Sequence, residues 1–127
     1  MITNLLSVGL GGFLGAILRA LTGIFISKFP TLLFFPFATL LVNVIGSFLI
    51  GIFLTLPLIT SNPNLKSFLT AGLLGGLTTF STFSFDTLTL IENQRFIAAG
   101  LNLFLNIVTA LIFCYLGTLV SKLLMAN

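Results

Sequence analysis

Four long apolar runs fill the chain, and short polar or proline-containing breaks separate them. A helix needs about 20 apolar residues to cross the hydrocarbon core of a bilayer, and each run reaches that length. The pattern therefore predicts an all-α membrane protein that folds as a single domain over residues 1–127, with four transmembrane helices. The predicted spans are roughly residues 5–26, 32–59, 69–91 and 96–119.

The breaks between the runs predict how the helices are connected. Each break is only a few residues long and contains polar residues or proline, as at residues 61–64 and 92–95. Connections this short join antiparallel neighbours. Four antiparallel spans place both termini on the same side of the membrane and use nearly the whole chain.

Composition agrees with a membrane location and excludes several kinds of chemistry. Apolar residues make up 57% of the 127 residues and charged residues 6%, whereas a soluble domain carries about 25% charged residues. The chain has no His and one Cys. These counts exclude His-based acid–base catalysis, Cys/His zinc sites and an intrachain disulfide, and we expect no enzymatic activity.

The positive charges are nearly balanced between the two sides of the membrane. Lys66 and Lys122 fall on the side of the termini, whereas Lys28 and Arg95 fall on the other side, joined by Arg19 if its side chain reaches the interface. Cytoplasmic loops normally carry the excess of Lys and Arg. Without a clear excess, we expect dual topology and an antiparallel homodimer. A single orientation set by other cues is the alternative.

Polar side chains within the second run share one helix face. Thr39, Asn43 and Ser47 are spaced four residues apart, which places them above one another on a helix. Their N–H and O–H groups are hydrogen-bond donors without a fixed charge. Such a stripe suits a small anion that sheds its water, and it equally suits hydrogen bonds between helices.

The third run holds the densest group of polar residues. Gly75 and Gly76 are followed by Thr78 and Thr79, and neither residue type favours a helix. We therefore expect the third helix to break at about mid-membrane depth. A break frees main-chain carbonyls, which are tolerated in a membrane where they are buried or coordinate a cation. Carbonyl oxygens suit a small hard cation such as sodium.

Phe80 and Phe83 lie three residues apart in the same segment, so they share a face if the segment is helical. The edge of an aromatic ring carries partial positive charge. Two such edges contact an anion without trapping it, as conduction requires. Ordinary packing is the competing interpretation, because the chain has 15 Phe residues.

The remaining polar residues of the spans have more than one interpretation. Arg19 either reaches the membrane interface or lines a water-filled vestibule that attracts anions. Asp86 either acts as a proton or ion relay, or is exposed or paired with Arg19 or Arg95. Asn102, Asn106 and Thr109 form a second donor stripe, in the fourth run.

Small residues spaced four apart predict close contacts between helices. This small-xxx-small spacing lets two helix backbones approach each other closely, and ordinary packing is its simplest meaning. The pairs are Gly11 and Gly15, Ser47 and Gly51, and Gly72 and Gly76.

Three motifs resemble the Fluc (CrcB-type) fluoride channel family. The motifs occur in the family's order, one in each of the first three spans, and the Thr-Thr-Phe-Ser-Thr-Phe-Ser string of the third is highly specific. The likeness covers the chain to about residue 86, and the fourth span is supported by its position and its Asn residues. The motifs are Gly-Gly-Phe-Leu-Gly-Ala-Ile-Leu-Arg at residues 11–19, Thr-Leu-Leu-Val-Asn-Val-Ile-Gly-Ser at 39–47 and Gly-Gly-Leu-Thr-Thr-Phe-Ser-Thr-Phe-Ser at 75–84.

The resemblance implies a passive fluoride channel, multi-pass in the cell (inner) membrane. It implies a dual-topology antiparallel homodimer with two pores and a structural sodium ion between the subunits. Such a channel lets the membrane potential drive fluoride out of the cytoplasm. By position, the implied pore residues are Phe80, Phe83, Asn43, Thr39, Ser81 and Thr82, the implied vestibule residue is Arg19, and the implied sodium ligands are the main-chain carbonyls of Gly75 and Thr78.

Two positions depart from the family's pattern. Asp86 stands where many members have the longer Glu, and Asn102 stands near a position where some members have Tyr. The resemblance therefore extends to the phenylalanines more closely than to the polar path that leads away from them.

The alternative function is a dual-topology small multidrug/proton exchanger, which also has four spans. That chemistry needs an acidic residue in a span and uses Trp and Tyr platforms. The first span has no acid, and the chain offers only Asp86, no Trp and one Tyr. A subunit without transport activity is a further alternative, but it leaves the cluster of hydroxyl residues in the third run without an explanation.

Overall fold

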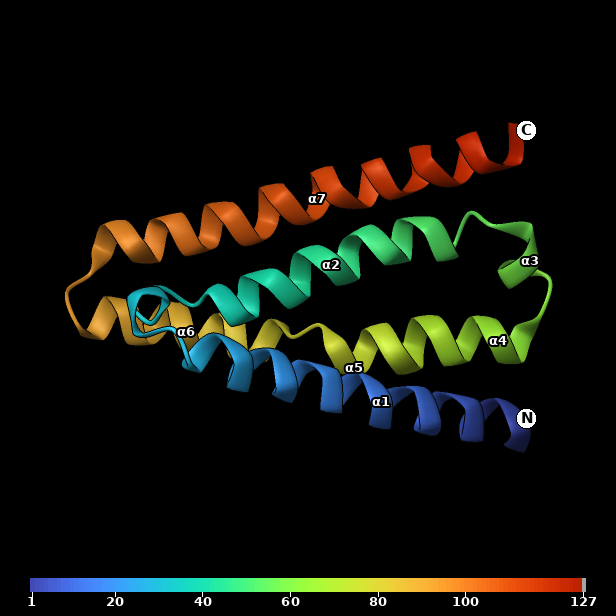
Figure 1. Cartoon of the computed structure of the whole chain (residues 1–127), viewed down its shortest axis with the longest axis horizontal. Helices are drawn as coiled ribbons and strands as arrows, with labels where there is room; N and C mark the ends of the chain where they lie inside the picture. Colours follow the sequence, from blue (N-terminus) through green and yellow to red (C-terminus); the bar gives the residue numbers. More distant parts are fainter. Residues whose placement is uncertain (127) are drawn as a thin grey trace.

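The computed structural model describes residues 1–126, and this part of the chain is helical with no β-strand (Figure 1). Long helical segments lie side by side and alternate in direction, and both termini lie at the same end of the molecule. The predicted all-α class and the common side of the termini are therefore confirmed. The segments outside the third run are α1 (Ile2–Ser27), η1 (Pro30–Leu32), α2 (Phe37–Phe53), α3 (Pro57–Thr60) and α7 (Phe96–Ala126).

The third run forms one rod from several consecutive pieces. It begins with α4 (Pro63–Ser67), continues as the π-helix η2 (Phe68–Leu74) and α5 (Gly75–Leu77), and resumes as α6 (Phe80–Glu92) after an interruption. The π-helix was not predicted. Because π-helices often occur at functional sites, its position directly before the interruption draws attention to this part of the rod.

Three helical segments are long and apolar enough to cross a membrane. They are Ile2–Ser27, Pro63–Glu92 and Phe96–Ala126. These segments confirm the first, third and fourth predicted spans, and each segment is longer than predicted.

The second predicted span, residues 32–59, is wrong in its ends, because α2 covers only 17 residues. Pro36 directly precedes α2, and Pro57 follows it. A residue before proline is pushed out of the helical conformation, and Leu56 is extended at φ −79° and ψ 120°. A helix of this length measures about 25 Å, slightly less than the roughly 30 Å of the hydrocarbon core.

Glycines let α1 lie directly against the π-helix and α5. A Cβ atom at Gly11 or Gly15 would collide with the main chain of these two elements, and a Cβ atom at Gly72 or Gly76 would crowd the main chain of α1. Two of the predicted small-residue pairs therefore meet each other. In the third pair, Gly51 of α2 contacts the main chain of α7 in the same way.

The buried core lies next to the interruption. Val42 of α2 packs with Leu74 and Leu77, and these three side chains are 2%, 2% and 7% exposed. Most other large apolar side chains of the described residues lie on the outside. The packed centre of the chain therefore surrounds the segment that the sequence marked as unusual.

Candidate functional site

The interruption confirms the predicted break in the third run, but two threonines form it. Thr78 (φ −77°, ψ 156°) and Thr79 (φ −152°, ψ 116°) are extended, whereas Gly75 and Gly76 are helical. Thr79 caps α6, because its Oγ1 accepts a hydrogen bond from the main-chain N–H of Thr82 at 3.2 Å. Side-chain capping, rather than glycine flexibility, therefore places the break.

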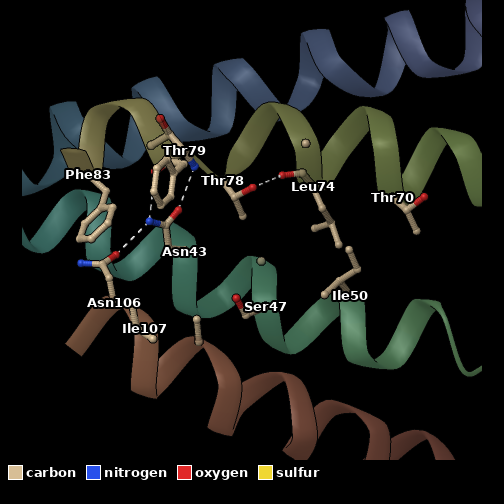
Figure 2. A pocket seen from close by; sticks show the side chains of 14 residues that line it. Asn43, Ser47, Ile50, Thr70, Leu74, Thr78, Thr79, Phe83, Asn106 and Ile107 are labelled. Atoms are coloured by element: carbon tan, nitrogen blue, oxygen red, sulfur yellow. Dashed lines mark hydrogen bonds between the residues drawn. The ribbon is translucent and has the colours of Figure 1, made fainter. Parts of the chain in front are cut away.

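Asn43 of α2 inserts its side-chain amide at the break. Its Oδ1 accepts from the N–H of Thr79 at 2.8 Å, and its Nδ2 donates to the carbonyl of Thr79 at 3.2 Å (Figure 2). In a continuous helix, that N–H would bond to the carbonyl of Gly75. Thr79 is only 7% exposed, and a buried main-chain group needs a partner. The Asn43 amide therefore replaces a helical partner that the break removes.

A chain of hydrogen bonds runs from Asn43 along α7 and back to α6. Asn43 Nδ2 also donates to Asn106 Oδ1 at 2.9 Å, and Asn106 Nδ2 donates to Asn102 Oδ1 at 2.9 Å. Asn102 Nδ2 then donates to Thr87 Oγ1 at 2.9 Å, and Thr87 Oγ1 donates to the Phe83 carbonyl at 2.8 Å. Two members of the predicted donor stripe of the fourth run, Asn102 and Asn106, are therefore joined to the break, whereas Thr109 donates to the carbonyl of Leu105.

A groove of about 360 Å³ lies beside the break, between α2, the third rod and α7 (Figure 2). Asn43, Phe80, Phe83 and Asn106 are among the residues that line it, and its described lining holds no carboxylate. The two rings meet edge to face, with centroids 5.4 Å apart and 60° between their planes. They share one wall of the groove, as their spacing predicted. The Phe83 ring is 5% exposed and the Phe80 ring 78%.

Ser81 and Thr82 lie in the first turn of α6, next to the cap. Thr79 Oγ1 donates to Thr82 Oγ1 at 3.0 Å and lies within hydrogen-bond distance, 3.3 Å, of Ser81 Oγ. Both side chains are exposed, and neither belongs to the described lining of the groove. Their implied role along a pore stays a prediction.

Thr39 lies apart from the other implied pore residues. It lines a second cavity, of about 700 Å³, together with Asp86 and Arg95. Thr39 Oγ1 donates to Asp86 Oδ2 at 2.6 Å. Within residues 1–126, Asp86 forms no ion pair with Arg19, and Arg95 donates instead to the carbonyl of Phe34. The predicted stripe of the second run is thus divided between two cavities, with Thr39 in one and Asn43 in the other.

Arg19 reaches inward to the break, and its implied role in a vestibule stays a prediction. Its Nη1 donates to the carbonyl of Thr78 at 3.3 Å, and the side chain is half-buried.

The described residues contain no group of three His, Cys, Asp or Glu side chains that could hold a metal. A cation at the break would therefore depend on main-chain carbonyls such as those of Thr78 and Gly75.

Sequence reasoning missed Thr87 and Thr70. Thr87 connects Asn102 to the Phe83 carbonyl, and Thr70 lines the groove from the π-helix. A signal existed for Thr87, which lies four residues after Phe83 and therefore on the same helix face. No comparable signal marked Thr70, because no residue pattern indicated a π-helix.

Comparison with known proteins agrees with the resemblance. The family described as "CrcB-like protein, Camphor Resistance (CrcB)" matches residues 6–118. Three similar proteins, each named "Fluoride-specific ion channel FluC", come from Campylobacter fetus subsp. fetus (strain 82-40), Elusimicrobium minutum (strain Pei191) and Shewanella sp. (strain ANA-3). They are 46%, 44% and 49% identical to this chain.

These matches extend over nearly whole chains. They cover 98%, 93% and 90% of this chain, and 98%, 93% and 92% of the respective relatives. The prediction that the chain is not an enzyme is confirmed by the family, which is one of ion channels. The chain therefore belongs to the CrcB-like family of membrane proteins.

Proposed function

We propose that this chain is a fluoride-selective passive channel, through which fluoride leaves the cytoplasm across the cell inner membrane. The observation that carries the proposal is the groove beside the break, where an amide donor and two aromatic rings converge without a carboxylate. The relatives named as fluoride-specific ion channels support the same ion. Membrane-spanning helices supply the setting that such a channel needs.

The chemistry of the groove suits a small anion that must move on after it binds. Ring edges carry partial positive charge, and side-chain N–H and O–H groups donate hydrogen bonds to an anion that has shed water. The Arg19 guanidinium is held at the neighbouring Thr78 carbonyl, so the groove lies near a positive charge. Weak sites of this kind let an ion enter and leave, as conduction requires.

The channel is proposed to work as an antiparallel homodimer with two pores. Phe80 lines the groove but is 78% exposed, so a single chain leaves most of its ring uncovered. A second copy in the opposite orientation would complete the wall on which this ring lies. The balance of Lys and Arg between the two sides supports both orientations in one membrane.

A structural sodium ion is proposed on the carbonyls of Gly75 and Thr78. The residues fit this ion, because the break takes the N–H of Thr79 away from the Gly75 carbonyl and gives it to Asn43. The Thr78 carbonyl accepts one hydrogen bond from Arg19 and has a second lone pair. Bound sodium would add a fixed positive charge beside the break.

Fluoride efflux from proteoliposomes tests the proposed function. Purified protein is reconstituted in vesicles loaded with potassium fluoride, and valinomycin sets the potassium potential while an electrode records fluoride. We expect release that stops when valinomycin is withheld, with far slower release of chloride from matched vesicles. Absence of release from folded, inserted protein would refute the channel and favour the drug/proton exchanger, with Asp86 as the next residue to test.

A further inference from the structure

Asn43 keeps no hydrogen free for an ion. A main-chain N–H only donates, so the side-chain atom that faces the N–H of Thr79 is Oδ1, and Nδ2 lies on the other side. One Nδ2 hydrogen points to the Thr79 carbonyl and the other to Asn106 Oδ1, at 3.2 and 2.9 Å. An anion in the groove therefore meets a donor that is already in use.

The acceptor on Asn106 is held in place by its own partners. Asn106 is 5% exposed, and its Nδ2 donates to both the carbonyl and the Oδ1 of Asn102, at 3.1 and 2.9 Å. Asn102 is fully buried and donates to Thr87, which donates to the Phe83 carbonyl. Donation thus runs in one direction from Asn43 to α6, and this direction keeps Oδ1 of Asn106 turned towards Asn43.

We propose that Oδ1 of Asn106 is an internal competitor that an anion must replace to take the Asn43 donor. This proposal rests on the proposed function and assigns to Asn106 a role in choosing the ion. The anion and Asn106 Oδ1 compete for the same hydrogen, and both residues line the groove (Figure 2). Binding then exchanges one acceptor for another rather than adding a hydrogen bond.

This exchange favours fluoride over larger halides. Hydrogen bonds to a charged acceptor are about twice as strong as those to a neutral one, and fluoride concentrates its charge in the smallest halide. Chloride spreads the same charge over a larger ion and accepts more weakly, so it gains less by replacing an amide oxygen. The competitor lowers the apparent affinity for both ions by the same factor, so it reduces occupancy by chloride at concentrations at which fluoride already saturates the site.

The flux ratio of chloride to fluoride tests this role. Asn106→Leu removes the competing acceptor at similar volume, and Thr109→Val is the matched control, because Thr109 lies on the same helix and bonds only to the carbonyl of Leu105. With both anions at a concentration that saturates the fluoride flux, we expect the ratio to rise about threefold in Asn106→Leu, the effect of one hydrogen bond between membrane helices, and to stay unchanged in Thr109→Val. Parallel loss of both fluxes with an unchanged ratio would overturn the proposal and leave Asn106 with a structural role.

The wild-type protein supplies a second readout that does not depend on the variant folding. The side-chain amide of Asn43 is followed by ¹⁵N NMR during titration with sodium fluoride or sodium chloride. We expect fluoride, and not chloride, to shift the Nδ2 resonance. An Asn43 resonance that fluoride leaves unchanged would overturn the competition, whereas absence of fluoride efflux from wild-type vesicles would instead refute the proposed function.

Discussion

Removal of the Asn43 side chain should destabilise the fold through the break that it holds. Asn43→Ala deletes three hydrogen bonds, two to Thr79 and one to Asn106. Interhelical hydrogen bonds in membrane proteins are each worth about 0.6 kcal/mol on average, which gives about 2 kcal/mol for three. The N–H of Thr79, buried at 7% exposure, is then left unpaired, and this raises the expected loss to about 3 kcal/mol.

A control variant and a double-mutant cycle divide this loss of stability between its causes. Thr55→Ala is the control, because Thr55 follows the same helix and bonds only to main-chain carbonyls four and three residues before it. A double-mutant cycle of Asn43→Ala with Asn106→Ala isolates the bond between the two amides. We expect a coupling energy of about 0.6 kcal/mol for that pair, so most of the effect of Asn43→Ala should come from Thr79.

The assay is reversible unfolding of purified protein in mixed micelles, followed by circular dichroism as the fraction of dodecyl sulfate rises. Helix loss reports the midpoint for the wild type, the two single variants, the double variant and Thr55→Ala. Equal midpoints for Asn43→Ala and Thr55→Ala would refute the reasoning. That result would mean that the break holds its shape without the amide, and that Thr79 finds another partner.

Other substitutions should lower the stability of the fold, raise it, or lower fluoride efflux. Gly15→Ala should destabilise the fold by several kcal/mol, because the new Cβ would collide with the main chain of the π-helix. At Gly9 a new Cβ meets no described atom within 4 Å, so Gly9→Ala should stabilise α1 by about 0.5–1 kcal/mol. The same unfolding assay compares the two variants. Ser121→Ala should be neutral or slightly stabilising in that assay, because Ser121 is fully buried and its Oγ has no hydrogen-bond partner among residues 1–126. Phe80→Ile and Phe83→Ile should each lower fluoride efflux at least about tenfold, because Ile lacks the positive ring edge, while assembly of the proposed dimer, measured by cross-linking, should match that of the wild type. Wild-type efflux in both variants would exclude the ring-edge contact.

Hydropathy and the spacing of small residues predicted most of the fold. Apolar runs marked the three described segments that are long enough to cross a membrane, and small residues four apart marked the contact between α1 and the third rod. These features depend on single residues and their near neighbours, so they are visible in the sequence. The exact extent of α2 was not visible in hydropathy, because apolar residues continue through Pro36 and Pro57 although the regular helix does not.

At the break, residue types predicted that the helix is interrupted but not at which residues. Gly75 and Gly76 have low helix propensity, yet both are helical, since propensity is weak against packing and Gly76 lies directly on α1. Thr79 instead gains a cap from its own hydroxyl and a partner in Asn43, 36 residues earlier. A contact at that distance in sequence has no local signal, so it could only be found in the folded chain.

The separation of hydrogen-bond partners along the sequence also explains why the site residues were easier to identify than their roles. Asn43 was expected either to offer donors to an anion or to form a hydrogen bond between helices. The hydrocarbon core provides no water to satisfy an amide, so such a group must find protein partners. It finds them in Thr79 and Asn106. A polar residue at this depth must therefore be bonded within the chain before any ion arrives, and under the proposed competition an anion takes the Asn43 donor only by exchange. The apparent affinity for an anion then depends on the partner that the anion displaces as much as on the donor that it reaches.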